Sequence, residues 1–256
     1  MTTREVLRHV DEPALARSVA GMLATRIAER MTQEAVVHLV LTGGGIGTAV
    51  LAELARDPVR DAIDWPRLHV WWGDERFEAT GSPERNETGA RSALLDHVPL
   101  DPRHVHPIAG PDLAATAEES AERYATELRG LAQPGAPVPD FAVVLLGIGP
   151  DAHVASMFPE LPAARIQDAT VSAVHGSPKP PPTRVTLTFP AINAAREVWV
   201  LAAGEGKADA IRLALDPSAG PWQVPAAGVH GVERTLFCVD EAAASRLPAD
   251  LGRTIA

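Results

Sequence analysis

Apolar residues recur along the chain in short, nearly continuous runs that alternate with segments of helical periodicity. The runs lie at 36–41, 68–72, 141–146, 198–202 and 235–239. Such runs are typical of strands that are covered on both faces of a parallel sheet. Apolar residues three and four positions apart predict helices over 11–31, 46–56, 114–131 and 207–215. The alternation predicts an α/β fold with a doubly wound, mostly parallel sheet flanked by helices, Rossmann-like in architecture.

One segment departs from this scheme. Residues 184–189 alternate between polar and apolar side chains, which is typical of a half-exposed or antiparallel strand, so we expect a small antiparallel excursion or subdomain there. The proline-rich stretches 133–139 and 177–182 are too short to tether separate domains and are interpreted as rigid loops. We therefore expect residues 1–256 to form a single α/β domain.

Composition narrows the classes of protein that fit. With 256 residues, 46% hydrophobic and 22% charged, the chain is in the globular range. A net charge of −10 argues against binding to nucleic acid or to an anionic membrane. The single cysteine, Cys238, excludes an intrachain disulfide and is interpreted as a buried thiol. No run is long enough for a membrane span and the N-terminus lacks a signal-peptide pattern, so a cytoplasmic protein is expected.

Four polar clusters directly follow predicted strands, where ligands bind in open α/β sheets. They are 42–45, 73–76, 147–153 and 204–207. The first begins at Thr42 and has three glycines that open into a helix: Gly43, Gly44 and Gly45. Backbone N–H groups and the helix dipole favour an anion there, although a tight strand-to-helix turn also explains the glycines. Thr48 stands where a dinucleotide motif needs glycine, and no Gly-Lys-Ser or Gly-Lys-Thr follows, so a small phosphorylated metabolite fits better than a nucleotide.

Charged residues in the second and fourth clusters suit the same ligand. Lys207 lies at the predicted start of a helix, where the dipole penalises a cation by up to about 1 kcal/mol unless an anion is bound. The alternative is a solvated lysine on a flexible glycine turn. Arg76 is suited to bind a phosphate or a carboxylate, and Asp74 to accept hydrogen bonds from sugar hydroxyls. An internal ion pair that fixes the loop is the competing interpretation.

His153 is the candidate for chemistry. It lies in a glycine-flanked loop after a buried strand, with the carboxylate of Asp151 two residues before it. Histidine titrates near neutral pH and is the natural general base in the cytoplasm. His104 and His106 have no cysteine or carboxylate partners at metal-ligand spacing, so we expect no metal there.

Taken together, the motifs resemble the 6-phosphogluconolactonase family, whose superfamily also contains glucosamine-6-phosphate deaminase. The segments that carry the resemblance appear in the family's order and are LTGGGIGTAVL (41–51), WWGDERF (71–77), SPERNETGAR (82–91), LLGIGPDAHVASMFP (145–159), PKPPPTRVTLTFPAIN (178–193) and VLAAGEGKADAI (200–211). The Asp-x-His-x-x-Ser-x-Phe-Pro segment is the most specific of them.

The resemblance implies hydrolysis of 6-phospho-D-glucono-1,5-lactone to 6-phosphogluconate, in the oxidative pentose phosphate pathway, without a metal or an organic cofactor. It implies that His153 activates water and that Asp151 orients the site or contacts the sugar. It assigns the phosphate to the 43–45 loop, Arg76 and Lys207. The residues it places near the substrate, or in support of those that contact it, are Asn86, Asp74 and Arg184. The expected partner is the small phosphorylated lactone, bound by a monomer or small homo-oligomer.

Two departures from the family pattern affect the expected site. The family usually has Asp-Gly-His, whereas Ala152 stands between Asp151 and His153, so a glycine-only backbone conformation there is excluded or strained. The first loop reads Thr-Gly-Gly-Gly-Ile-Gly-Thr-Ala rather than Ser-Gly-Gly-Ser-Thr-Pro. A hydroxyl contact to phosphate is therefore lost or taken over by Thr42 or Thr48.

Two other functions compete with the lactonase. The related deaminases typically carry an Asn-Glu-Pro segment after the histidine, whereas this chain continues Ser156-Met157-Phe158-Pro159. A non-catalytic sugar-phosphate sensor is the second alternative, since related folds serve as effector domains of transcription regulators. The sequence has no evident additional DNA-binding segment, and its net charge is unfavourable for one.

Overall fold

The main sheet has seven strands, all parallel, in the order β10-β1-β9-β8-β5-β2-β3. The computed structural model describes residues 4–255. The strands of the main sheet are β1 (Arg4–His9), β2 (Val37–Leu41), β3 (Leu68–Trp72), β5 (Phe141–Gly147), β8 (Glu197–Ala202), β9 (Arg234–Asp240) and β10 (Arg253–Thr254). The expected parallel α/β architecture is confirmed, and the five predicted strands agree with the observed ones to within one residue at each end.

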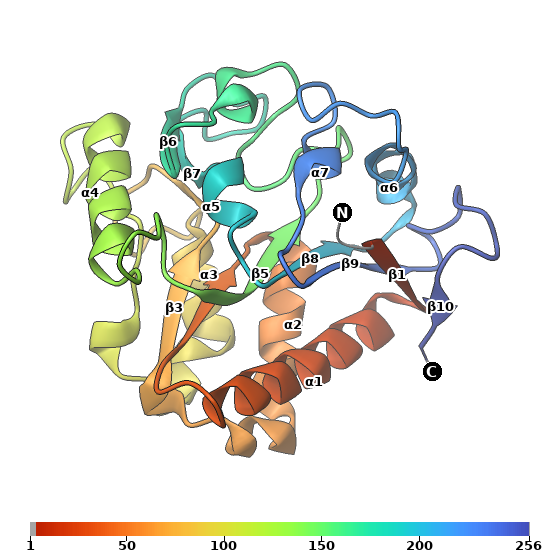
Figure 1. The fold of residues 1–256 in the computed structure, drawn as a ribbon, viewed down its shortest axis with the longest axis horizontal. Coiled ribbons are helices and arrows are strands. Elements are labelled where there is room, and N and C mark those ends of the chain that lie inside the picture. Colours follow the sequence, from red (N-terminus) through yellow and green to blue (C-terminus); the bar gives the residue numbers. More distant parts are fainter. Residues whose placement is uncertain (1–3, 256) are drawn as a thin grey trace.

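Helices cover the sheet on both sides. They are α1 (Glu12–Met31), α2 (Gly44–Arg56), α3 (Asn86–Ala93), α4 (Ala117–Gly130), α5 (Phe189–Ile192), α6 (Ala208–Ala214) and α7 (Pro225–Gly228). In Figure 1, α1 and α2 lie below the main sheet, and α5, α6 and α7 lie above it. The first helix shows how the sequence sets its bounds. The Asp11 carboxylate caps it by accepting from the Ala14 N–H at 2.8 Å, and Leu15, Val19 and Ile27 of its apolar stripe are fully buried.

The chain changes direction across the sheet between β2 and β5. From β2 it continues outward to the edge strand β3, and it then returns to β5 on the other side of β2. The loops that follow β2 and β5 therefore leave the sheet side by side and diverge. This topological switch point is where open α/β sheets bind their ligands.

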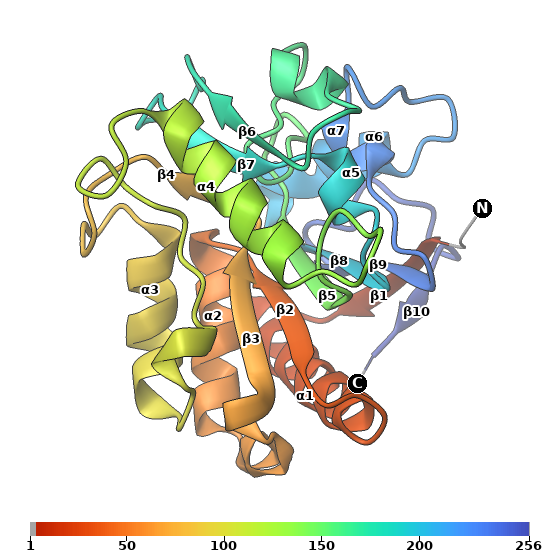
Figure 2. The same ribbon diagram turned by 60° about the vertical axis from the view of Figure 1, so that its left-hand side comes forward.

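A second, antiparallel sheet of three strands follows directly from β3. Its order is β4 (Asp74–Arg76), β7 (Arg184–Leu187), β6 (Val171–Val174), and α4 packs on β6 and β7 (Figure 2). The expected antiparallel excursion is thus confirmed. Of the two expected kinds of strand, half-exposed or antiparallel, the structure shows the antiparallel one, and all four residues of β7 are buried. Its polar side chains make internal hydrogen bonds: Thr186 Oγ1 accepts from the Ser156 N–H and donates to the Leu187 carbonyl. Phe189 is not part of the strand but opens α5.

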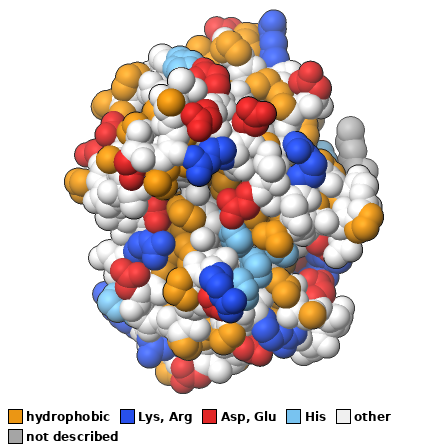
Figure 3. All heavy atoms as spheres, turned by 90° about the vertical axis from the view of Figure 1, so that its left-hand side faces the viewer, with side chains coloured by type: hydrophobic (Ala, Val, Ile, Leu, Met, Phe, Trp, Pro, Cys, Tyr) orange, Lys and Arg blue, Asp and Glu red, His pale blue; other side chains and the backbone are white. Residues whose placement is uncertain are grey.

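Four histidines form a cluster that crosses β2, β3 and the segment beside β3. On the face shown in Figure 3, histidine side chains gather near the centre. The members of this histidine cluster are His38, His69, His104 and His106. The ring of His69 stacks on that of His104 at 3.9 Å between centroids, and its Nδ1 lies 2.9 Å from Nε2 of His106. Trp71 Nε1 donates to Nδ1 of His38 at 3.1 Å. The rings therefore pack against one another and against an indole.

Two members of the cluster, His38 and His69, are held in the uncharged form. Burial first, and the neighbouring histidines second, lower the pKa of His38 to about 3 and that of His69 to about 4. Two carboxylates face the cluster: Asp101 acts against the shift of the His69 pKa, and Glu127 Oε1 lies 2.5 Å from Nδ1 of His106. A folded-state pKa below the unfolded value of about 6.5 means that the unfolded chain binds protons first as the pH falls.

We expect the histidine cluster to make the fold acid-sensitive. Its stabilising contribution is complete above pH 6.5 and declines as the pH falls toward 4. Burial raises the pKa of Glu75 to about 7, which acts in the opposite direction over this range, so the informative quantity is a difference between variants. In His38→Asn/His69→Asn, Oδ1 can replace the acceptor Nδ1. We expect this variant to lose about 2 to 4 kcal/mol less free energy of unfolding than the wild type between pH 7 and pH 5, since each replaced histidine contributes up to about 2 kcal/mol over this range.

Urea denaturation at several pH values measures this difference. The exposed His230 provides the matched control, and His230→Asn is expected to follow the wild type at every pH. Parallel curves for the wild type and the double variant would show that the cluster does not control acid stability.

Two further expectations concern single features. Cys238 is fully buried in β9, and burial raises the pKa of its thiol to about 12, as expected for a structural cysteine. Within residues 4–255, the helices are too short or too polar to cross a membrane.

Candidate active site

A pocket opens at the switch point, beyond the carboxyl ends of β2, β3, β5 and β8. It has a volume of about 370 Å³. Ten of the predicted site residues line it, namely Thr42, Gly43, Gly44, Gly45, Asp74, Arg76, Asn86, His153, Arg184 and Lys207. The eleventh, Asp151, lies directly behind His153. The structure therefore brings together residues from six separate segments of the chain.

The glycine loop opens α2, and the first residues of this helix line the pocket. Gly43 is the N-cap of α2 and has no side chain to satisfy the first N–H groups of the helix. Gly44 has a φ of +80°, which favours glycine. A Cβ on Gly43 would lie 1.8 Å from Oδ1 of Asn86, so a larger residue would displace that side chain. The loop thus presents backbone donors to the pocket; close packing requires glycine at position 43, and the backbone conformation favours it at position 44.

Thr42 joins the two loops that flank the switch point. Its Oγ1 accepts from the Gly147 N–H at 3.1 Å, which ties the end of β2 to the end of β5. The hydroxyl also borders the pocket, whereas Thr48 is not among the described residues that line it. Of the two threonines expected to supply a hydroxyl, only Thr42 is in place to do so.

Asp74, Arg76 and Asn86 form one wall of the pocket and are bonded to each other. Asn86 Nδ2 donates to the Asp74 carbonyl at 2.8 Å, and its Oδ1 accepts from Nη1 of Arg76 at 2.7 Å. Asp74 Oδ2 accepts from Oγ of Ser156 at 2.6 Å. These bonds fix both charged groups in position. Asp74 is 7% exposed, so it has little free surface for a sugar hydroxyl.

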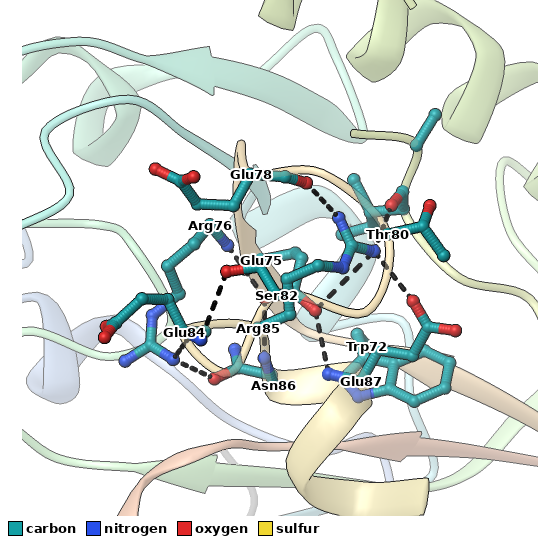
Figure 4. A network of polar contacts seen from close by, with 12 residues as sticks. Trp72, Glu75, Arg76, Glu78, Thr80, Ser82, Glu84, Arg85, Asn86 and Glu87 are labelled. Atoms are coloured by element: carbon teal, nitrogen blue, oxygen red, sulfur yellow. Dashed lines mark hydrogen bonds and ion pairs between the residues drawn. The ribbon is translucent and has the colours of Figure 1, made fainter. Parts of the chain in front are cut away.

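A buried carboxylate that the sequence did not single out holds this wall from behind (Figure 4). Glu75 is 1% exposed and accepts from the backbone N–H groups of Arg76, Asn86 and Glu87 at 2.7 to 2.8 Å. The buried Arg85 guanidinium lies 3.9 Å from it and opposes the effect of burial on its pKa. The loop is therefore fixed internally through Glu75, while Arg76 lines the pocket.

His153 and Asp151 are paired at the mouth of the loop after β5. Their Nδ1 and Oδ1 atoms are 2.5 Å apart. Burial alone would raise the pKa of Asp151, but the hydrogen bond and the charge of His153 outweigh it and lower the pKa to about 2. A carboxylate that accepts the Nδ1 proton orients the ring, so that the other nitrogen, Nε2, is the atom that can act as a base. Phe158 packs on the ring at 4.4 Å between centroids and restricts its orientation.

Backbone geometry brings this pair together. Ala152 has a φ of +63° and is fully buried, so the chain takes the left-handed conformation for which the usual glycine is suited. Of the two expectations for Ala152, that a glycine-type backbone conformation is excluded or that it is strained, the structure shows the strained conformation. Gly149 packs against the pair so closely that a Cβ would lie 2.0 Å from Nδ1 of His153 and 2.4 Å from Oδ1 of Asp151.

Arg184 lines the pocket, but its guanidinium donates mainly to other groups of the protein. It is 4% exposed, and it donates to the carbonyls of Lys179, Pro180 and Pro181 at 3.1 to 3.2 Å. Its Nη1 lies 3.8 Å from Oδ2 of Asp74. The resemblance left two roles open for Arg184, contact with the substrate or support of the residues that contact it. This arrangement favours the supporting role.

Lys207 lies opposite the glycine loop, directly before α6. Its Nζ donates to the Ile148 carbonyl at 2.7 Å, so it is not a solvated lysine on a flexible turn. Burial, and next the charge of Lys179, lower its pKa. Four cationic side chains and the carboxylates of only Glu12 and Asp74 line the pocket, which makes it locally positive within an acidic protein. This is the environment that a dianionic ligand requires.

Among residues 4–255, no group of three or more His, Cys, Asp or Glu side chains is arranged to hold a metal ion. His104 and His106 belong instead to the histidine cluster.

The chain is similar in sequence to one known family and to several characterised relatives. A family model described as glucosamine-6-phosphate isomerases/6-phosphogluconolactonase matches residues 10–237. The chain is 53% identical to a 6-phosphogluconolactonase of Streptomyces coelicolor over 253 residues, with 97% of each chain covered. It is 42% identical to a 6-phosphogluconolactonase of Mycobacterium tuberculosis, covering 93% of this chain and 96% of that one.

Solved structures agree on the fold. The 6-phosphogluconolactonase of Trypanosoma brucei superposes with a TM-score of 0.84 at 28% identity, over 97% of this chain and all of that one. A monomeric glucosamine-6-phosphate deaminase superposes with a TM-score of 0.79 at 20% identity, over 94% of this chain and 99% of that one. At that identity the second likeness concerns the fold alone.

Proposed function

Because the chain belongs to the glucosamine-6-phosphate isomerase/6-phosphogluconolactonase family, we infer that it hydrolyses 6-phospho-D-glucono-1,5-lactone to 6-phosphogluconate. Relatives that carry this activity in their names are up to 53% identical over nearly the whole chain. The observation that carries the inference is the Asp151–His153 pair, which faces a pocket lined by cations and by the glycine loop. The reaction belongs to the oxidative pentose phosphate pathway, and we expect the enzyme to act in the cytoplasm.

The proposed mechanism uses the two ends of the pocket separately. The 43–45 loop, Arg76 and Lys207 bind the phosphate, and this remote binding energy fixes the lactone. A water molecule then lies between Nε2 of His153 and C1 of the lactone. His153 removes a proton as the water oxygen attacks C1, and Asp151 stabilises the resulting imidazolium. Collapse of the tetrahedral intermediate breaks the bond between C1 and the ring oxygen, which takes the proton back from His153.

This chain lacks the acidic residue that the deaminases typically carry in the segment after the histidine. Residues 154–159, directly after His153, contain no acidic residue, and the fully buried Ser156 donates to Asp74 and does not line the pocket. We therefore expect no release of ammonia from glucosamine 6-phosphate.

The decisive assay is the hydrolysis of freshly prepared 6-phosphogluconolactone, with spontaneous hydrolysis subtracted. Turnover well above the background supports the lactonase. A rate equal to the background, together with tight binding of 6-phosphogluconate, would favour the non-catalytic sensor.

Removal of the phosphate-binding cations should abolish discrimination between substrates. We expect Arg76→Ala and Lys207→Ala each to lower kcat/KM for the phosphorylated lactone by about 10- to 100-fold, since a hydrogen bond to a charged group contributes about 1.5 to 3 kcal/mol. The rate with unphosphorylated glucono-1,5-lactone should change little. The ratio of the two kcat/KM values is the measurement. A variant that keeps the wild-type ratio would show that the phosphate is held elsewhere.

A further inference from the structure

Lysine is rare in this protein, and both lysines lie at the same pocket. Of 23 lysine and arginine residues, only Lys179 and Lys207 are lysines. Both line the pocket at the switch point. They come from unrelated segments, since Lys179 lies in the proline-rich loop before β7 and Lys207 directly precedes α6. The resemblance to the lactonase family implies that Lys207 binds the phosphate, and it implies no role for Lys179.

Lys179 differs from the other cationic residues of the pocket, whose charged groups are hydrogen-bonded to protein. Arg76 donates to Glu84 and Asn86, Arg184 donates to three carbonyls, and Lys207 donates to Ile148. Within the described part of the chain, the ammonium of Lys179 has no hydrogen bond or ion pair with protein.

The loop that carries Lys179 is nevertheless fixed. Nη2 of Arg184 donates to the Lys179 carbonyl at 3.1 Å, and Oγ of Ser177 donates to the same oxygen at 2.9 Å. The Ser177 N–H donates to the Pro182 carbonyl at 3.0 Å, which closes the loop on itself. The main chain of Lys179 is thus held by buried partners while its side chain stays half-buried in the pocket wall.

The two lysines are close enough to influence each other. After burial, the charge of Lys179 is the next cause that lowers the pKa of Lys207, and it also helps to lower that of Asp151. Two neighbouring ammonium groups repel each other in the absence of a ligand. A phosphate dianion removes this repulsion and supplies acceptors for both groups.

We propose that Lys179 is a specificity-determining residue of this enzyme, which binds the phosphate of the substrate together with Lys207 and is positioned for this by Arg184. The proposal rests on the proposed function for the identity of the substrate. The main-chain hydrogen bonds of the loop bring a free ammonium to the pocket at little cost in conformational entropy of the backbone.

The presence of only two lysines permits a direct test without activity. In protein labelled with [ε-¹³C]lysine, two side-chain signals are expected, assigned with Lys179→Arg and Lys207→Arg. Titration with inorganic phosphate and with 6-phosphogluconate should shift both signals together and raise the pKa of both ammonium groups. Gluconate, which lacks the phosphate, should leave the Lys179 signal unchanged. A Lys179 signal that does not respond to either phosphate-containing ligand would overturn the proposal.

Kinetics provide the second test. We expect Lys179→Ala to raise KM for 6-phosphogluconolactone by about 10- to 100-fold, with a much smaller change in kcat, and to leave kcat/KM for glucono-1,5-lactone nearly unchanged. Lys179→Arg should recover most of the affinity, and Arg129→Ala, at an exposed position on α4, should match the wild type. Equal losses on the two lactones would place Lys179 at the reacting carbonyl and contradict the proposal.

The link to Arg184 is tested by a double-mutant cycle. If Arg184 acts through Lys179, the losses in Arg184→Gln and Lys179→Ala should not add in the double variant. Additive losses would remove Arg184 from a positioning role. If the wild type shows no turnover of either lactone, the proposed function fails, and the lysine titration still decides whether Lys179 binds phosphate.

Discussion

Replacement of His153 by alanine is expected to lower kcat for 6-phosphogluconolactone by about 10²- to 10⁴-fold, the range typical of a lost general base. The physical reason is the pairing with Asp151 at 2.5 Å, which directs the Nδ1 proton to the carboxylate and leaves Nε2 to accept a proton from water. Without this base, water attacks the lactone as slowly as it does in solution, apart from the contribution of binding. The measurement is the initial rate on fresh lactone after subtraction of the spontaneous reaction.

Binding should survive this substitution, because the proposed phosphate contacts lie on other segments. His153→Ala is therefore expected to bind 6-phosphogluconate within a few-fold of the wild type, as measured by calorimetry. Retention of wild-type turnover would remove His153 from the mechanism. Loss of binding and turnover together would show instead that the variant has a disordered site.

The second large effect is expected at a residue with no functional group. Gly149→Ala introduces a methyl group 2.0 Å from Nδ1 of His153 and 2.4 Å from Oδ1 of Asp151, so the pair must separate or rotate. Displacement of a catalytic group by about 1 Å costs on the order of 100-fold in rate. We expect kcat to fall by about this factor while the affinity for 6-phosphogluconate changes little.

The control for this substitution is Gly21→Ala on α1, where a Cβ meets no atom within 4 Å. It should retain full activity and gain slightly in thermal stability, because alanine favours helix more than glycine does. Thermal unfolding of both variants separates a local effect from a general loss of structure. Wild-type kcat in a well-folded Gly149→Ala would mean that the pair is not held by this contact.

Most of the main sheet could be predicted because buried parallel strands have a distinctive composition. The strand β1 was not predicted because only Val6 and Leu7 are apolar, and charged or polar residues flank them on both sides. Arg8 is buried only because its guanidinium donates to the carbonyls of Pro248 and Leu251, which are more than 200 residues away. Burial of a charged side chain by distant carbonyls leaves no periodic signal in the local sequence.

The candidate site could be located because its residues follow strands that share one edge of the sheet. Their division of labour depends on tertiary contacts and could not be predicted. The antiparallel pairing of β4 with β7 opposes Arg76 to Arg184 and brings Nη1 of Arg184 to 3.8 Å from Oδ2 of Asp74. The role of Glu75 likewise depends on the packing of Asn86 and Glu87 against it, since the spacing of these residues in the sequence does not specify that contact.

The position of β1 between β9 and β10 determines when the sheet can be completed during synthesis. Residues 4–9 leave the ribosome early, but their hydrogen-bonding partners at 234–240 and 253–254 are translated last among the strands. A ribosome adds about 5 to 20 residues per second, so β1 waits for on the order of ten seconds or more with both edges unpaired. The charged residues that hide β1 from pattern recognition also oppose pairing with other nascent chains during that interval.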